Sequence, residues 1–210
     1  MSRIQCMCAG VAKASLALII LLTVTVGAGA APTTLQNMQT AFNGESNAHV
    51  RYLAFAKQAD SEGYGQVASL FRAAALAEEV HAANHAAVIK EMGAVPQANI
   101  ESPVVKATRE NLEAAIKGET YERDTMYPAF IKQATLDGNS AAITSLNFAK
   151  TAEAEHAKLY ARCLQNLDNL KGSKSTIFFV CPTCGYTTSE MNFANCPSCF
   201  TLGEKFEKVV

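Results

Sequence analysis

The chain has no tryptophan, only six prolines and a formal net charge of -1. This composition, with 49% hydrophobic residues, suits packed helices. Because acidic and basic residues nearly balance, the chain has no net positive charge of the kind that nucleic-acid-binding proteins carry. Nucleic acid is therefore not expected among the partners. No Gly-x-Gly-x-x-Gly motif occurs, and the chain therefore encodes no nucleotide site of its own for an electron donor.

Charged residues are also missing from the stretch between Lys13 and Pro32. We interpret residues 1–31 as a secretory signal peptide, because the apolar centre is short for a membrane span and small residues at its end suit cleavage after Ala30 or Ala31. The alternative is an uncleaved membrane anchor, since about 18 uncharged residues are the lower limit for spanning. Neither a twin arginine nor a lipoprotein cysteine is present. We expect an exported protein, located in the periplasm or anchored by this segment.

Four of the seven cysteines fall near the C-terminus, as Cys181, Cys184, Cys196 and Cys199. Two Cys-x-x-Cys pairs separated by about a dozen residues predict a tetrahedral metal site, whereas disulfides are the alternative in an oxidising compartment. Four thiolates leave no open coordination position, so the site serves structural zinc or one-electron iron. Cys163 is left over and is expected to be a buried apolar side chain.

The rest of the mature chain carries helical periodicity, broken by Gly63–Gly65, by Gly93–Pro103 and by Asp137-Gly138. Four long helices are predicted, at 33–61, 66–92, 104–137 and 139–171. One long crossover between two hairpins is the ferritin-like topology. We therefore predict a mainly α protein, with a ferritin-like domain at 33–171. A small rubredoxin-like domain follows at 175–210, begins with a strand at 176–180 and needs metal to fold.

Two Glu-x-x-His pairs lie in matching places of the two hairpins, Glu78 with His81 and Glu153 with His156. The i, i+3 spacing puts a carboxylate and an imidazole on one helix face, where both can reach one metal ion. A single such pair is weak support for a metal site, because helical glutamates and histidines are usually surface or core residues. Two matching pairs are a much stronger indication.

The other two helices carry Glu45 and the pair Glu119 and Glu122. Counted from the hairpin turns, the acids of all four helices lie at a similar height, about 25 Å along each helix. A glutamate from each of two helices and a Glu-x-x-His from each of the other two is the ligand set of a di-iron carboxylate centre. The sequence thus predicts two iron ions inside the bundle.

Several stretches then resemble the rubrerythrin family in the family's order. They are Phe42-Asn43-Gly44-Glu45-Ser46, Gly118-Glu119-Thr120-Tyr121-Glu122, Met126-Tyr127-Pro128, Ala152-Glu153-Ala154-Glu155-His156 and Cys181-Pro182-Thr183-Cys184-Gly185-Tyr186. The resemblance covers nearly all of the mature chain. It implies iron ligands at Glu45, Glu78, Glu119, Glu122, Glu153 and His156, and it implies that His81 exchanges with Glu122 as one iron changes redox state.

The resemblance also implies that Tyr52 and Tyr127 hydrogen-bond ligand carboxylates and act in catalysis with Glu122. It further implies a peroxidase that reduces hydrogen peroxide to water, with electrons relayed through iron in the cysteine domain from an external donor protein. A homodimer or larger assembly is expected, with each cysteine domain against a neighbour's di-iron site. The signal peptide and two histidines near the site, His49 and His85, depart from this pattern.

Two other functions stay open at the level of sequence. One is a ferritin-like iron-handling protein with a structural zinc tail, which the metal of the tail distinguishes. The other is an electron-transfer protein whose bundle is only a scaffold, which peroxide turnover distinguishes.

Overall fold

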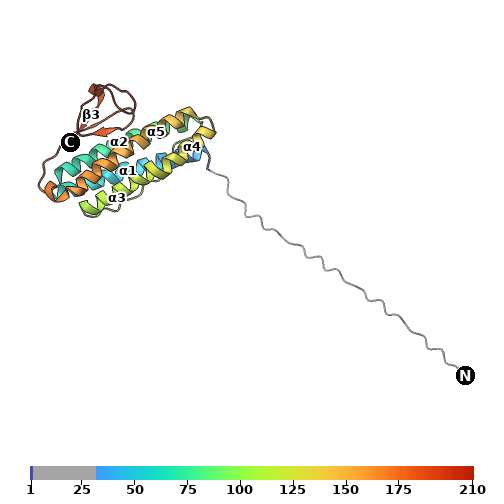
Figure 1. Cartoon of the computed structure of the whole chain (residues 1–210), viewed down its shortest axis with the longest axis horizontal. Coiled ribbons are helices and arrows are strands. Elements are labelled where there is room, and N and C mark those ends of the chain that lie inside the picture. The colour runs from blue at the N-terminus through green and yellow to red at the C-terminus, as the bar shows by residue number, and fades with distance from the viewer. Residues whose placement is uncertain (2–31) are drawn as a thin grey trace. The chain divides into compact units, whose positions relative to one another are not determined.

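The computed structural model describes Met1 and residues 32–210, and it folds the long stretch mainly into helices (Figure 1). The predicted signal peptide lies outside the described residues apart from Met1. The α-helices are α1 (Thr34–Ser61), α2 (Gly65–Glu91), α3 (Thr108–Tyr121), α4 (Tyr127–Leu136) and α5 (Ser140–Gln165). Because α3 and α4 follow one another as a single column interrupted only by a short π-helical segment, these helices confirm the predicted ferritin-like four-helix bundle.

Among the described residues, no helix combines the length and apolarity needed to cross a membrane.

The two hairpins are closed by local sequence signals. Thr33 caps α1 through a reciprocal pair of hydrogen bonds with Gln36. Gly63 and Gly138 end the first helix of each hairpin with φ of 78° and 68°, a left-handed conformation that glycine adopts without steric cost. The chain therefore reverses within a few residues at both turns.

The helix predicted at 104–137 differs from the observed one in two respects. It starts at Thr108, since the residues before it belong to the crossover, and a π-helical segment, η1 (Glu122–Met126), separates α3 from α4. The final helix ends at Gln165 and continues only as the 3-10 turn η2 (Leu167–Leu170), not to 171 as one helix. π-helical insertions are frequent at functional sites.

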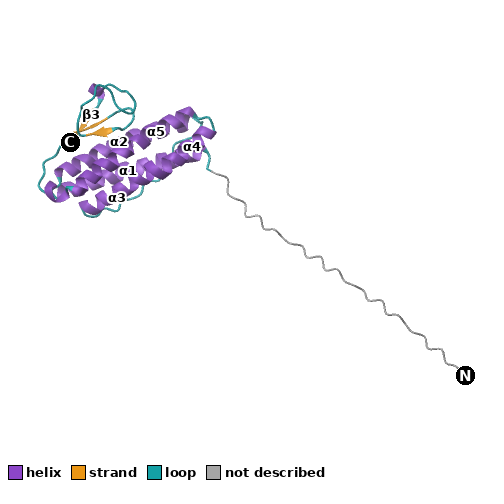
Figure 2. Ribbon diagram, viewed as in Figure 1, coloured by secondary structure: helices purple, strands orange, loops and turns teal. Residues whose placement is uncertain are grey.

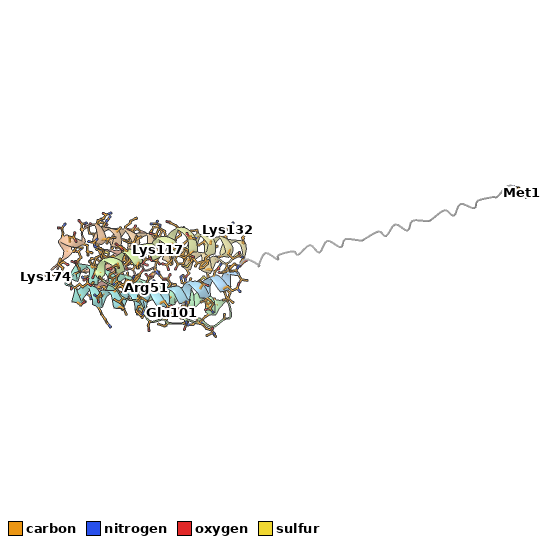
Figure 3. The ribbon with its side chains drawn as sticks, turned by 90° about the horizontal axis from the view of Figure 1, so that it is seen from below. Met1, Arg51, Glu101, Lys117, Lys132 and Lys174 are labelled. Atoms are coloured by element: carbon orange, nitrogen blue, oxygen red, sulfur yellow. The ribbon has the colours of Figure 1, made fainter. Side chains whose placement is uncertain are left out.

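The long crossover between α2 and α3 is held by side chains of α1. The side-chain oxygens of Gln39, Asn43 and Asn47 accept hydrogen bonds from the backbone of residues 97, 99 and 101 at 3.1, 2.7 and 2.8 Å. These polar side chains replace the backbone partners that an extended segment lacks. The crossover thus follows α1, and Figure 3 labels Glu101 at its place beside the bundle.

Two apolar clusters fill the bundle and leave a polar space between them. One cluster contains Tyr52, Phe71 and Tyr160, and the other contains Met38 and Tyr127. Along α1 and α2, the buried acids fall between the residues of the two clusters. The acids therefore occupy a layer that is closed by apolar packing on both sides.

The C-terminal residues form a small module with β1 (Phe178–Val180), β2 (Thr187–Thr188), the 3-10 turn η3 (Gly203–Lys205) and β3 (Glu207–Val209). The strands pair antiparallel in the order β2-β1-β3 and lie on one side of the bundle (Figure 2). Phe178 and Val180 of β1 are part of the same apolar cluster as Phe71 of α2. Module and bundle therefore share a core.

The module was expected against a neighbouring chain's site, but in this structure it packs against the bundle of its own chain. Gly65, at the start of α2, donates its backbone N–H to Ser173 at 3.2 Å, and Figure 3 labels the adjacent Lys174 at one end of the bundle. His81 lies about 24 Å further along α2. The linker continues directly into extended β1, and eight extended residues at about 3.3 Å each cover that distance.

Candidate metal centres

Six buried side chains from four helices of the bundle lie close together, and we call this group the carboxylate layer. They are Glu45 of α1, Glu78 and His81 of α2, Glu119 of α3, and Glu153 and His156 of α5, each at most 1% exposed. In each Glu-x-x-His pair the two side chains touch, because residues three apart share a helix face. The distances are 2.9 Å from His81 Nδ1 to Glu78 Oε2 and 2.8 Å from His156 Nδ1 to Glu153 Oε2.

The carboxylate layer divides into two overlapping sets of ligand atoms, each with all its atoms within 4.8 Å of one another. The first set is Glu45, Glu78, His81 and Glu153, and the second is Glu78, Glu119, Glu153 and His156. Glu78 and Glu153 belong to both sets. Two metal ions are therefore each offered one imidazole and one carboxylate of their own, and they share two bridging carboxylates.

The donor chemistry fits divalent iron. Carboxylate oxygens and neutral imidazoles are suitable ligands for Fe(II), and four carboxylates balance the charge of two such ions. Glu45 Oε2 and Glu119 Oε2 are buried and have no hydrogen-bond partner among the described residues. Buried carboxylate oxygens without a partner are costly unless a cation binds them, so this layer is suited to a di-iron centre.

Without metal, the layer holds protons tightly. Burial and the negative charge of Glu153 raise the pKa of Glu119 to about 8, and burial with Glu153 and Glu45 raises the pKa of Glu78. Burial opposes ionisation of Glu153 as well, but the charges and hydrogen bonds of His81 and His156 outweigh it and lower its pKa. Metal binding must therefore displace protons from several of these groups.

Two tyrosines fix the outer carboxylates of the two sets. The Tyr52 hydroxyl donates to Glu119 Oε1 at 2.6 Å, and the Tyr127 hydroxyl donates to Glu45 Oε1. His85 lies behind Tyr127, with Nε2 at 3.4 Å from the tyrosine hydroxyl and Nδ1 at 2.7 Å from Ser145 Oγ. His85 Nε2 also lies 3.7 Å from Glu45 Oε1, so this histidine borders the layer both through Tyr127 and directly.

The remaining predicted residues are placed differently. Glu122 is half-buried in the π segment and belongs to neither ligand set among the described residues. Burial and neighbouring carboxylates, Glu45 first among them, raise its pKa. His49 points to the backbone, with Nδ1 at 2.7 Å from the Ala75 carbonyl oxygen. The structure therefore shows His81, rather than Glu122, completing the first set.

The second ring nitrogen of each layer histidine faces the cysteine module. His81 Nε2 lies 3.2 Å from the Cys184 carbonyl oxygen, and His156 Nε2 lies 3.0 Å from Thr187 Oγ1. A carbonyl oxygen only accepts hydrogen bonds, so we assign the hydrogen of His81 to Nε2. In the neutral ring Nδ1 then presents its lone pair to the first set, as a metal ligand requires.

The four cysteines of the module gather their sulfurs within 4.8 Å of one another and form no disulfide. Sulfur separations of 3.5 Å for Cys181 to Cys199 and 3.6 Å for Cys184 to Cys196 approach the edge of about 3.8 Å expected for tetrahedral ligands at 2.3 Å. The hydrogen bond with the Cys184 thiol lowers the pKa of Cys181 to about 4, so a thiolate is present at neutral pH. Cys163 is buried, as predicted, and is bonded to no other cysteine of residues 32–210.

Sequence reasoning missed two residues near the histidines. Tyr160 is buried against Tyr52 and Phe71, and its hydroxyl has no partner among the described residues. Its i+4 spacing from His156 was a signal that could have identified it. Thr187 carries no such signal, because only the docking of the module brings it to the bundle.

Comparison with known proteins gives consistent matches. A family model described as Rubrerythrin matches residues 36–164. Nigerythrin of Nitratidesulfovibrio vulgaris is 39% identical over 179 residues, covering 83% of this chain and 85% of that relative. Rubrerythrin-2 of Clostridium acetobutylicum is 33% identical over 176 residues, covering 83% of this chain and 95% of the relative.

Solved structures of nigerythrin and of a bacterioferritin have similar folds. A structure described as the fully reduced, all-ferrous state of nigerythrin superposes with a TM-score of 0.78 at 36% identity, covering 88% of this chain and 91% of that one. Desulfovibrio desulfuricans bacterioferritin, at 23% identity and a TM-score of 0.63, covers 68% of this chain and 89% of its own and shares the fold.

Proposed function

Because the chain belongs to the rubrerythrin family, we propose that it is a di-iron peroxidase that reduces hydrogen peroxide with electrons relayed through an iron ion in the cysteine module. The reaction consumes one peroxide, two electrons and two protons, and it forms two waters. When bound, the iron ions supply the electrons that break the O–O bond. The residues of the chain bind the metals, hold protons beside them and connect the two metal sites.

The contact between Cys184 and His81 is the observation that carries this proposal. Cys184 offers its sulfur to the module's metal, while its backbone carbonyl oxygen lies 3.2 Å from His81 Nε2. One residue and one hydrogen bond thus connect a ligand of the one-electron site to a ligand of the di-iron site. A protein that only stores iron does not need this connection.

Protons are held close to the same place. The Tyr52 and Tyr127 hydroxyls donate hydrogen bonds to Glu119 and Glu45, respectively. Glu122 lies outside both ligand sets, and burial together with nearby carboxylates raises its pKa, which favours its protonated form over that of an exposed glutamate. We assign Glu122 as the proton donor and the tyrosines as the groups that hold the ligand carboxylates in place.

The test separates relay from peroxide chemistry by using Cys184→Ser. Donor-driven peroxide consumption is expected to fall to background, while one round of oxidation of the chemically reduced protein by peroxide is retained and the helical circular dichroism is unchanged. The matched control is Cys163→Ser, the same change at a buried thiol outside both metal sites. Full donor-driven turnover in Cys184→Ser would refute the relay, and failure of the reduced wild-type protein to react with peroxide would refute the peroxidase.

The metal of the module distinguishes the main alternative, an iron-handling protein with a structural zinc tail. We propose iron, because a redox-active metal beside the di-iron site suits repeated turnover. Protein isolated from its native compartment should show a visible thiolate-to-iron absorption band. Stoichiometric zinc without this band would contradict the proposal.

We also propose that the protein assembles as a homodimer or larger homo-oligomer. Large apolar side chains remain exposed on the bundle and crossover, including Val95 at 71%, Val104 at 76% and Leu136 at 73%. Single exposed apolar side chains also occur on monomers, so the proposal rests on the resemblance to the rubrerythrin family, which implies an assembled protein. Light scattering of the active protein is expected to give at least twice the chain mass, and a monomer with undiminished activity would contradict the assembly.

A further inference from the structure

Thr187 lies at the point where the module meets His156. Its side-chain oxygen is 3.0 Å from His156 Nε2, and both residues are at most 1% exposed. The same hydroxyl donates its hydrogen to the Gly185 carbonyl oxygen at 3.0 Å. Because its one hydrogen is used in this way, Thr187 Oγ1 is an acceptor toward His156.

This arrangement determines the state of the imidazole ring. Nε2 must carry the hydrogen that Thr187 accepts, so Nδ1 is the nitrogen that faces Glu119, Glu78 and Glu153 and that offers its lone pair once a metal ion displaces its hydrogen. The acceptor is firmly placed as well. Thr187 pairs with Val180 in the sheet, and the adjacent turn is closed by a 2.9 Å hydrogen bond from Cys181 N to Tyr186 O.

We propose that Thr187 is a positioning residue for His156, through which the cysteine module strengthens metal binding at the position formed by His156, Glu119 and the two shared glutamates. The two histidines depend on different acceptors. His81 uses the Cys184 backbone carbonyl, which no side-chain substitution removes, whereas His156 uses a side-chain hydroxyl. Loss of that hydroxyl therefore weakens one metal position and leaves the other.

The test measures ferrous ion binding, not turnover, and its result is independent of the proposed peroxidase activity. Full-length protein with a loaded cysteine site is titrated anaerobically with ferrous ion against a competing chelator. Thr187→Val keeps the shape of the side chain and removes the hydroxyl. We expect one of the two bundle ions to bind roughly tenfold more weakly and the other to be unchanged, since removal of such supporting hydrogen bonds typically costs this much metal affinity.

Two variants provide the controls. Thr187→Ser restores the acceptor and should bind both ions like the wild type. Thr188→Val makes the same change one residue further along β2 and should also leave both affinities unchanged, because within the described part of the chain this hydroxyl bonds only to Glu190. The proposal is overturned if Thr187→Val binds both ions normally, if it weakens both equally, or if Thr187→Ser is as weak as the valine variant.

Discussion

Gly185 permits the close approach of the module to His81. A Cβ atom at this position would lie 2.2 Å from His81 Nε2, and the residue has φ of +74°. Gly185→Ala should therefore push the turn that contains Cys184 and Gly185 away from the bundle and break the contact between Cys184 and His81. We expect loss of donor-driven turnover and a destabilisation of more than about 1 kcal/mol, measured by activity and chemical denaturation.

Gly138→Ala is the matched control for this substitution. Gly138 has a similar φ of +68°, and a Cβ there would meet nothing within 4 Å. This variant should show the backbone cost of about 1 kcal/mol and keep the relay. Equal activity in the two variants would show that close packing at Gly185 is unnecessary.

The raised carboxyl pKa values predict how the metal-free protein responds to pH. Burial and the charge of Glu153 raise the pKa of Glu119 to about 8, above its ordinary 4.5, so the folded chain binds this proton more tightly than the unfolded chain. The extra free energy of unfolding is present at low pH. It is lost as pH rises from the ordinary pKa toward the raised pKa, by up to ~1.4 kcal/mol per pH unit for each such proton. His81 and His156, with pKa values raised above 6.5, act in the same direction.

After iron is removed by chelation, the melting temperature should therefore fall between pH 5.5 and pH 8. The lowered pKa of Glu153 affects stability only below this interval. Glu119→Gln should flatten the slope, because the variant removes the group that titrates. Ferrous ion should bind more tightly as pH rises, since it displaces protons. A melting temperature that rises with pH in the metal-free protein would contradict this account.

Individual ligands could be predicted where a local spacing identifies them. The i, i+3 pairs of Glu78 with His81 and Glu153 with His156 are determined by helix geometry alone, and the structure brings both pairs into one layer. Thr187 could not be predicted, because its role depends on where a separate module docks. The absence of Glu122 from both ligand sets could not be predicted either, because Glu122 begins a π segment that the sequence does not distinguish from an α-helix.

At the scale of elements, the π segment holds one more residue than an α-helical turn and keeps α4 in phase with α3. Its hydrogen bond from Tyr127 N–H to Glu122 O spans five residues, and deleting one residue between them would leave the four-residue spacing of an α-helix. Deleting Asp124 should therefore keep the buried Tyr127 against Glu45 and lower the free energy of unfolding by about 1 kcal/mol or less, measured by chemical denaturation.

The substitution Asp124→Ala provides the comparison for this deletion. Asp124 is exposed, and in the described structure its carboxylate bonds only to Arg123, so the alanine variant should unfold at nearly the wild-type denaturant concentration. If the deletion variant unfolds at a much lower denaturant concentration than Asp124→Ala, α4 depends on the extra residue for its orientation.

The hairpins could be predicted from sequence because glycine marks their turns and apolar periodicity marks their helices. Gly63 and Gly138 have the positive φ that such turns require. The π segment at Glu122–Met126 could not be predicted in this way. Its five residues have a composition typical of helices, so periodicity does not distinguish them from an α-helical turn.

At the scale of the whole molecule, the two metal sites depend on each other for their surroundings. The module's cysteines lie on a fold of about 35 residues that cannot bury enough apolar surface alone. Phe178 and Val180 obtain that burial from the bundle, and the bundle's histidines obtain acceptors from Cys184 and Thr187. Metal binding in the module therefore contributes to folding of the module and to order in the carboxylate layer.

The final prediction concerns export, which we propose from the first 31 residues of the sequence. A chain that crosses the membrane unfolded must acquire its metals afterwards, where Cys181, Cys184, Cys196 and Cys199 can also be oxidised to disulfides. We expect the mature chain to begin near Ala31 or Pro32, with these four cysteines bound to metal and Cys163 free. Burial raises the pKa of the Cys163 thiol to about 11, which keeps it protonated and unreactive. Mass spectrometry of the exported protein tests both parts. An intact N-terminus would indicate a membrane anchor, and a disulfide between Cys181 and Cys184 in active protein would contradict the metal site.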